Sequence, residues 1–199
     1  EWRELYAALD CGAVAAIHPF YTAAVREFED AGKPIIGSAP VGVEGTNSWI
    51  DSIGDTFNIA KKIIGEAKQK ILPQIQKSLD DKKINNKITV SGYEGSELIV
   101  ARTLIEAGAE VPYVGTACPK TKWSTEDKDW LESRGVFVKF RASLEDDISA
   151  VKSVNPDLAI GTTPVVQKAK ELGIPSLYYT NLISARPIMG VAGAGSLAE

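Results

Sequence analysis

The chain of 199 residues is 44% hydrophobic and 24% charged, with a formal net charge of −4. These values predict a globular protein with one large or two small cores. The acidic balance and the scattered lysines disfavour nucleic-acid binding, and no apolar run is long enough to span a bilayer. Cys11 and Cys118 lie far apart and form neither a metal-binding motif nor a disulfide framework, so we expect a reducing, cytoplasmic location.

The first 80 residues alternate short apolar runs with amphipathic stretches. A helix at the very start, without a cap, and a single methionine (Met189) lead us to interpret the sequence as an internal fragment of a longer protein. The predicted elements are an amphipathic helix at 1–9, a buried strand at 13–17, a helix at 21–31, a strand at 34–36, a loop at 37–45 and a long helix at 49–79 with a kink or break at Pro73.

The polar run at 80–87 is the clearest candidate for a domain boundary. Beyond it strands and helices alternate, which is typical of an α/β fold with a doubly wound, Rossmann-like parallel sheet. Strands are predicted at 88–91, 111–115, 136–140, 158–160 and 177–179, and helices at 97–107, 126–134, 144–154 and 165–172.

Polar residues follow the last two predicted strands, where parallel sheets bind ligands beyond their carboxyl ends. Thr162 and Thr163 follow the strand at 158–160, and Thr180 and Asn181 follow the strand at 177–179. We therefore expect all four residues to line a substrate site.

Common nucleotide and hydrolase motifs are absent. Gly92-Tyr93-Glu94-Gly95 replaces the dinucleotide fingerprint and puts a carboxylate where a pyrophosphate would lie. No Walker-type loop occurs, so nucleotide hydrolysis would belong to another subunit. The single histidine, His18, has no nucleophile elbow to serve.

Three segments together carry a family resemblance: AAIHPFY at 15–21, SGYEGSELIVARTL at 91–104 with YVGTACP at 113–119, and GTTPVVQKAKELGIPSLYYTNLISARP at 161–187. They resemble the Y subunits of chlorophyllide a oxidoreductase, a nitrogenase-like enzyme of bacteriochlorophyll synthesis. The resemblance covers the whole chain. It implies the nitrogenase component 1 fold, with 1–80 ending the middle Rossmann-like domain and 88–199 forming a third domain that is truncated at its C-terminus.

The resemblance also implies a function. An iron–sulfur reductase component with ATP-Mg would deliver single electrons to a heterotetramer of Y and Z subunits, which would reduce the C7–C8 double bond of chlorophyllide a. The [4Fe-4S] ligands of the Y subunit would lie outside this chain, so Cys11 and Cys118 are not expected to hold a metal. Two alternatives remain: the N subunit of light-independent protochlorophyllide reductase, and a non-catalytic nitrogenase-like scaffold or small-molecule binding module.

Nitrogenase itself places cofactor ligands at two positions that are similar to Pro19 and Thr180 here, and neither of these residues can anchor an iron–molybdenum cluster. We expect an equivalent cavity that is suited to a flat apolar macrocycle. The aromatic residues expected to line it are Phe20, Tyr21, Tyr93 and Tyr179.

His18 and Glu94 are the candidate catalytic residues. His18 could donate a proton or bind the magnesium of the pigment, and its alternative is an imidazole that bonds nearby backbone. Glu94 could donate a proton, with a solvated helix start as its equal alternative. For Glu97 the solvated position is preferred, because an acidic side chain there favours the helix dipole.

Ser96 and Arg186 complete the expected site. Ser96 lies in a loop that approaches the cofactor in nitrogenase, so we expect it to line the pocket. Only one of Tyr178 and Tyr179 can face the cavity, because the two alternate along a strand. Arg186 could pair with the propionate of the pigment or form a structural salt bridge.

Overall fold

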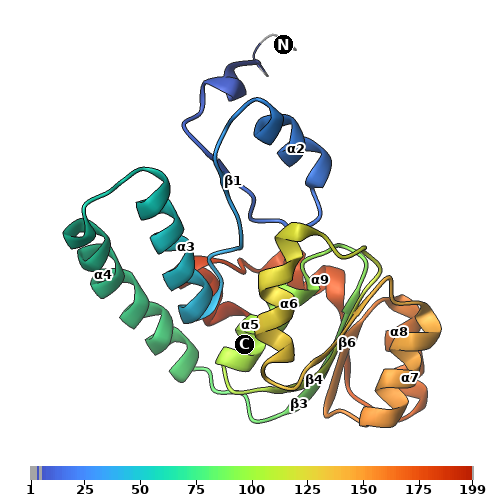
Figure 1. The fold of residues 1–199 in the computed structure, drawn as a ribbon. Helices are drawn as coiled ribbons and strands as arrows, with labels where there is room; N and C mark the ends of the chain where they lie inside the picture. The colour runs from blue at the N-terminus through green and yellow to red at the C-terminus, as the bar shows by residue number, and fades with distance from the viewer. Residues whose placement is uncertain (1–3, 5, 199) are drawn as a thin grey trace.

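A five-stranded parallel sheet organises the second part of the chain in the computed structural model, which describes residues 4 and 6–198 (Figure 1). The strand order is β5-β4-β3-β6-β7, and every neighbouring pair is parallel. The strands are β3 (Lys87–Gly92), β4 (Glu110–Thr116), β5 (Phe137–Phe140), β6 (Leu158–Gly161) and β7 (Ser176–Tyr178).

Helices cover both faces of this sheet, as Figure 1 shows. The expectation of a doubly wound α/β fold is therefore confirmed. Because β4 and β6 flank β3 on opposite sides, the chain reverses its winding at β3, and the crevice beyond that strand is the usual ligand position. On one face lie α5 (Glu97–Glu106) and α6 (Thr125–Glu132), and on the other lie α7 (Leu144–Val154) and α8 (Thr163–Glu171).

Local signals fix the bounds of α7 as predicted. The Ser143 hydroxyl accepts a hydrogen bond from the amide of Asp146, and the Asp146 carboxylate accepts one from the Ser143 amide; this capping box begins the helix. Asn155 ends it in the left-handed conformation with φ 47°.

The first residues form a small unit of their own. It contains η1 (Tyr6–Asp10), β1 (Val14–Ala15), α2 (Thr22–Asp30) and β2 (Ile35–Ile36), with β1 parallel to β2. The expected helix at 1–9 lies partly outside the described residues, and its described part is a 3-10 helix with no buried side chain. The expected strand at 13–17 is only two residues long, because its pairing with β2 covers only Val14 and Ala15.

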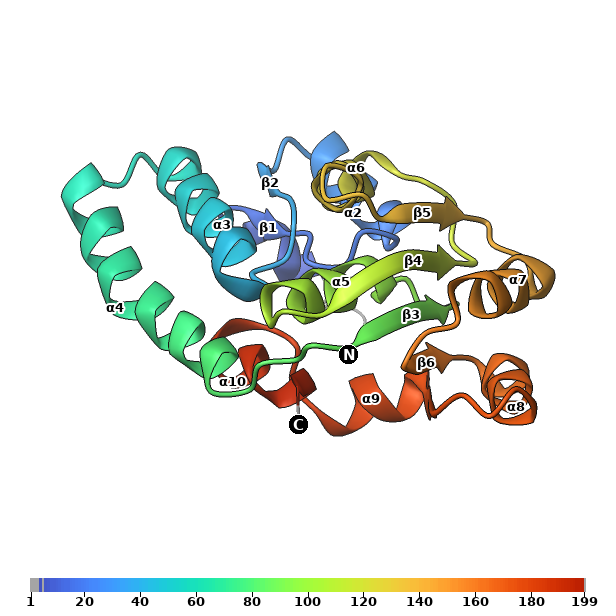
Figure 2. The same ribbon diagram turned by 90° about the horizontal axis from the view of Figure 1, so that it is seen from below.

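The prediction of one long helix with a break at Pro73 is wrong. Two antiparallel helices occur instead, α3 (Gly42–Thr56) and α4 (Lys61–Asp80), and they form a hairpin beside the sheet (Figure 2). Asn58 adopts φ 50° between them, and Pro73 lies inside α4. The expected loop at 37–45 is correspondingly shorter, because α3 begins at Gly42.

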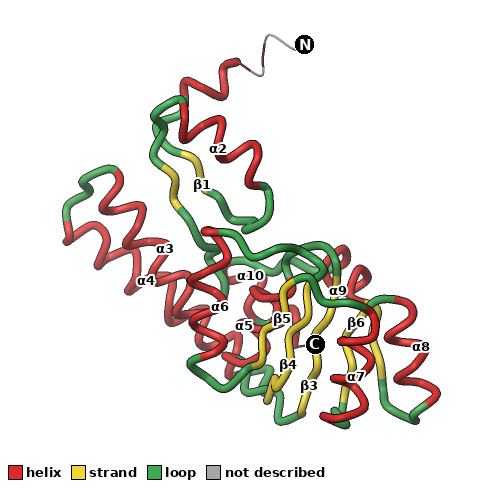
Figure 3. The backbone as a smooth tube through the Cα atoms, turned by 45° about the vertical axis from the view of Figure 1, so that its right-hand side comes forward, coloured by secondary structure: helices red, strands yellow, loops and turns green. Residues whose placement is uncertain are grey.

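The last strand also ends earlier than expected. β7 stops at Tyr178, and α9 (Tyr179–Ala185) follows directly where a loop was predicted. α10 (Gly190–Ala194) and η3 (Ser196–Ala198) complete the described chain. Figure 3 shows that the loops at one end of the sheet run beside the small unit of β1 and α2.

Aliphatic side chains between the sheet and α5 form the main core. Arg102 and Asp127 pair at 2.5 Å within it, and both are almost fully buried. Nothing among the described helices is both long and apolar enough to cross a membrane.

Candidate functional site

The loop after β3 is the centre of the site. Gly95 adopts φ 90° in this loop, a conformation that favours glycine. A side-chain carbon at Gly95 would collide with Phe20 and would lie 2.9 Å from the His18 ring. The loop backbone can therefore pack directly against the small unit only because residue 95 is glycine.

His18 lies where the small unit meets this loop. Its Nε2 lies 2.9 Å from the backbone oxygen of Glu94, and Nδ1 accepts a 3.4 Å bond from the Phe20 amide. Since a carbonyl oxygen can only accept, Nε2 carries the proton and the ring is the neutral Nε2–H tautomer. Burial lowers the pKa of His18, although the bond to Glu94 opposes this effect.

Both ring nitrogens of His18 are thus engaged by backbone groups. In this geometry neither nitrogen is available to a magnesium ion or a reacting carbon. The ring face stacks on Tyr21, with centroids 4.0 Å apart and an interplanar angle of 12°. His18 therefore supports an aromatic surface here.

Glu94 presents its carboxylate beside this aromatic surface. Its Oε1 accepts a 3.0 Å hydrogen bond from the hydroxyl of Thr180, at the start of α9. The side chain is neither fully buried nor fully exposed. A carboxylate that is oriented by one hydroxyl and still reaches solvent can exchange protons.

The aromatic residues do not enclose a cavity as expected. Tyr179 is buried, and its hydroxyl lies 2.7 Å from the Ser96 hydroxyl, so it locks α9 to the loop. Tyr21 and Tyr93 instead remain 67% and 60% exposed. Tyr179 begins α9 and packs into the main core, whereas Tyr21 immediately precedes α2 and Tyr93 lies in the bend after β3. Both rings are therefore exposed and do not line a cavity.

The expected solvated position of Glu97 is wrong. Its side chain is fully buried, because the loop folds back over the start of α5. Its two carboxylate oxygens accept 2.9 Å bonds from the amides of Glu94 and Gly95. Burial raises the pKa of Glu97, and these bonds together with one from Thr116 oppose the rise.

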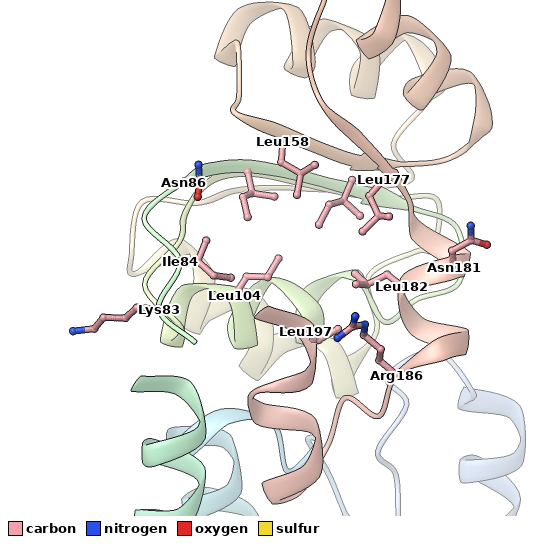
Figure 4. A pocket seen from close by; sticks show the side chains of 12 residues that line it. Lys83, Ile84, Asn86, Leu104, Leu158, Leu177, Asn181, Leu182, Arg186 and Leu197 are labelled. Atoms are coloured by element: carbon pink, nitrogen blue, oxygen red, sulfur yellow. The ribbon is translucent and has the colours of Figure 1, made fainter. Parts of the chain in front are cut away.

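The remaining predicted residues do not all join this group. Thr162 caps α8, and Thr163 begins the helix at the exposed surface. Asn181 and Arg186 line a different feature, an apolar cavity of about 570 Å³ between the sheet and α9 (Figure 4). Arg186 donates a 2.5 Å bond to the backbone oxygen of Ser196.

Sequence reasoning missed this cavity because its aliphatic walls come from elements far apart in the chain. It also missed Thr121, whose hydroxyl donates a 2.6 Å bond to the Pro19 oxygen and so holds the His18 turn. The sequence partly indicates the role of Glu97, because an acidic residue near the start of a helix often accepts hydrogen bonds from the free backbone amides there.

No cluster of three His, Cys, Asp or Glu side chains suited to a metal ion occurs among residues 4 and 6–198. Cys11 and Cys118 are both free thiols, and Cys118 donates to the backbone oxygen of Tyr93 at 3.8 Å. Two separate thiols cannot hold a [4Fe-4S] cluster, which needs four ligands. The described residues therefore do not fit such a cluster.

Comparison with known sequences identifies relatives along the whole chain. Residues 1–199 match the family described as nitrogenase component 1 type oxidoreductase. The chlorophyllide reductase 52.5 kDa chains of Cereibacter sphaeroides and Rhodobacter capsulatus are each 65% identical over 199 residues. The light-independent protochlorophyllide reductase subunit N of Prochlorococcus marinus (strain MIT 9211) is 24% identical over 191 residues, 94% of this chain and 45% of that subunit. This chain spans only 40% of the length of the two chlorophyllide reductase chains.

Solved structures share the fold. A structure described as nitrogenase Cp1 at pH 5 has a TM-score of 0.62 and 14% sequence identity. The match covers 89% of this chain and 43% of the nitrogenase chain. Another structure, nitrogenase Cp1 at pH 6.5, has a TM-score of 0.59 and 22% sequence identity. The match covers 87% of this chain and 40% of that nitrogenase chain. At these identities the likeness supports the fold alone.

Proposed function

The chain belongs to the nitrogenase component 1 type oxidoreductases, and we propose that it is part of the Y subunit of a chlorophyllide a reductase. The single observation that carries this proposal is the 65% identity to two chlorophyllide reductase chains over all 199 residues. The whole enzyme would reduce the C7–C8 double bond of chlorophyllide a during bacteriochlorophyll synthesis.

The surface at the carboxyl end of β3 would bind the pigment. Tyr21 and Tyr93 offer exposed aromatic faces, and Tyr21 is held flat against the neutral His18 ring. A flat macrocycle buries a large apolar area on such faces. Because the surface is open in this chain, another domain or the Z subunit would cover the opposite face of the pigment.

Glu94 is the proton donor that this geometry favours over His18. The imidazole uses both nitrogens on backbone groups, whereas the Glu94 carboxylate needs only Thr180 to orient it. Each pair of electrons added to a carbon–carbon double bond requires two protons, and Glu94 in its protonated form would deliver one of them from Oε2, since Oε1 accepts from Thr180. The second proton would come from outside this chain.

The electrons would arrive from elsewhere in the assembly. We propose that a [4Fe-4S] cluster, held by residues outside this chain, supplies them, and that a separate iron–sulfur reductase component uses ATP-Mg. A heterotetramer with the Z subunit is part of the same proposal. The contribution of the described residues is to bind, orient and protonate the pigment.

An anaerobic turnover assay tests the function. The full-length parent protein would be mixed with its Z subunit, the reductase component, ATP and a reductant, and then offered chlorophyllide a and protochlorophyllide separately. Reduction of chlorophyllide a, seen as a bacteriochlorin absorption spectrum, is the expected result. Turnover of protochlorophyllide alone would assign the chain to the sister enzyme, whose N subunit from Prochlorococcus marinus (strain MIT 9211) is only 24% identical. Turnover of neither, with cluster and partners verified, would favour a binding module.

A further inference from the structure

The fully buried carboxylate of Glu97 has no place in the proposed proton transfer. Burying a carboxylate is unfavourable unless polar groups compensate for the lost water. Glu97 is compensated by the amides of Glu94 and Gly95, each at 2.9 Å, and by the Thr116 hydroxyl. In the part of the chain that the structure describes, no lysine or arginine pairs with it. Both carboxylate oxygens therefore hold the backbone of the loop after β3, and Thr116 on β4 adds a side-chain bond.

Two glycines make this arrangement possible. A side-chain carbon at Gly92 would collide with Oε1 of Glu97, so the missing side chain leaves the space that the carboxylate fills. A side-chain carbon at Gly95 would collide with Phe20 on the other side of the loop. The loop is thus packed against Glu97 on its inner side and against the small unit on its outer side.

The two amides bound by Glu97 belong to Glu94, which is partly exposed, and to Gly95, which packs against the small unit. The Glu94 amide is fixed by Oε1, while the Glu94 carbonyl accepts from His18 and the Glu94 side chain meets Thr180. A change of the Glu97 side chain, on the inner side of the loop, would therefore move the Glu94 carbonyl and the Glu94 carboxylate on its outer side. The hydrogen bond between Ser96 and Tyr179 holds the end of the loop independently.

We propose that Glu97 is the positioning residue of this site, which fixes the backbone of Glu94 and Gly95 so that Glu94 and His18 face the substrate surface. Its importance for pigment reduction rests on the proposed function, but its effect on the loop does not. Glu97 acts through the backbone of Glu94 and touches no substrate.

The test compares Glu97→Gln with wild type in the full-length protein. A glutamine side chain offers one oxygen acceptor, so only one of the two amides keeps its partner and the other faces an NH₂ group. Amide hydrogen exchange of residues 94 and 95 and the pKa of His18, from deuterium exchange at its ring carbon, are the two readouts. Neither readout requires pigment turnover, so they remain informative if the proposed function is wrong.

Loss of a hydrogen bond to a buried charged group corresponds to a roughly tenfold or greater change in a local opening equilibrium. We expect amide exchange at 94 and 95 to become about tenfold faster in Glu97→Gln. A loosened loop would bury the His18 ring less. The pKa of His18 should then rise toward its usual value, because burial is the largest cause of its lowering.

Asp147→Asn is the matched control, since it also replaces a buried carboxylate by an amide, but in α7, on the opposite face of the sheet from α5. It should change neither readout. If Glu97→Gln fails to fold, Gly92→Ala displaces the carboxylate without removing it and should give the same two changes. Two results would overturn the proposal. One is that amide exchange at residues 94 and 95 and the pKa of His18 in these variants match those of wild type. The other is that both quantities change equally in Asp147→Asn.

Discussion

At the scale of single residues, the site depends on polar side chains that bond backbone atoms. Glu97, His18 and Thr121 each direct a side-chain group at a loop backbone. A sequence reveals which residues are polar, but not which distant amide or carbonyl will lie within reach. The alternative in which backbone groups bond the His18 imidazole is the one observed, but its distant partner, the Glu94 carbonyl, and the burial of Glu97 could not be predicted.

The Tyr179 hydroxyl should contribute measurably to stability, because it lies 2.7 Å from the Ser96 hydroxyl and both groups are buried. Tyr179→Phe leaves the Ser96 hydroxyl without this partner, at a cost of about 1–3 kcal/mol in the free energy of unfolding. Urea unfolding of the full-length protein measures this cost. Tyr178→Phe is the matched control, since Tyr178 is only partly buried, and an equal loss in both variants would contradict the assignment.

At the scale of elements, the sequence predicted best where local signals define both ends. The capping box at Ser143 and the left-handed Asn155 mark α7 without help from tertiary structure. The turn between α3 and α4 contains Asn58 in a left-handed conformation. Asparagine is a weaker signal of a helix end in a sequence than proline, yet Pro73 is tolerated inside α4. α9 was missed because Tyr178 and Tyr179 continue the apolar pattern of a strand, so periodicity alone could not show where β7 ends.

The buried ion pair should hold α6 against α5. Asp127→Ala removes the carboxylate that pairs with the buried Arg102 guanidinium, and removing one partner of a buried pair typically costs about 3–5 kcal/mol. Glu44→Gln is the control, because Glu44 pairs with Arg134 at the exposed surface, where an ion pair contributes under about 1 kcal/mol. Similar losses for the two variants in urea unfolding would contradict this account.

The packing of α7 on β4 should depend on pH through Asp147. Burial raises the pKa of Asp147 to about 6, although its carboxylate accepts a 2.8 Å bond from Tyr113. The folded state therefore keeps this proton to a higher pH than the unfolded chain, whose aspartate titrates near pH 4. The stabilising contribution is complete below about pH 4 and disappears as the pH rises through about 6.

Asp147→Asn cannot titrate and should lack this component. Urea midpoints of both proteins between pH 4 and pH 7 should show wild type losing more stability than the variant across that range. Parallel pH curves would mean that Asp147 has no raised pKa in the folded state.

At the scale of the whole molecule, the doubly wound sheet brings the candidate residues to the end of β3. The chain order predicted this edge, and the family resemblance identified the aromatic residues near it. The separation of Asn181 and Arg186 into another cavity could not be predicted, because it results from α9 turning away from the strand end. The division into two domains at residues 80–87 stays a prediction.

The most direct test of the central claim is the dissociation constant for chlorophyllide a of the full-length enzyme, titrated by absorbance without oxygen. Tyr93→Ala should weaken binding about tenfold, since an aromatic face contributes both buried area and stacking. Phe137→Ala is the matched control, because Phe137 is 62% exposed but lies at the start of the edge strand β5. Unchanged binding in Tyr93→Ala, or an equal loss in Phe137→Ala, would contradict a pigment site at the end of β3.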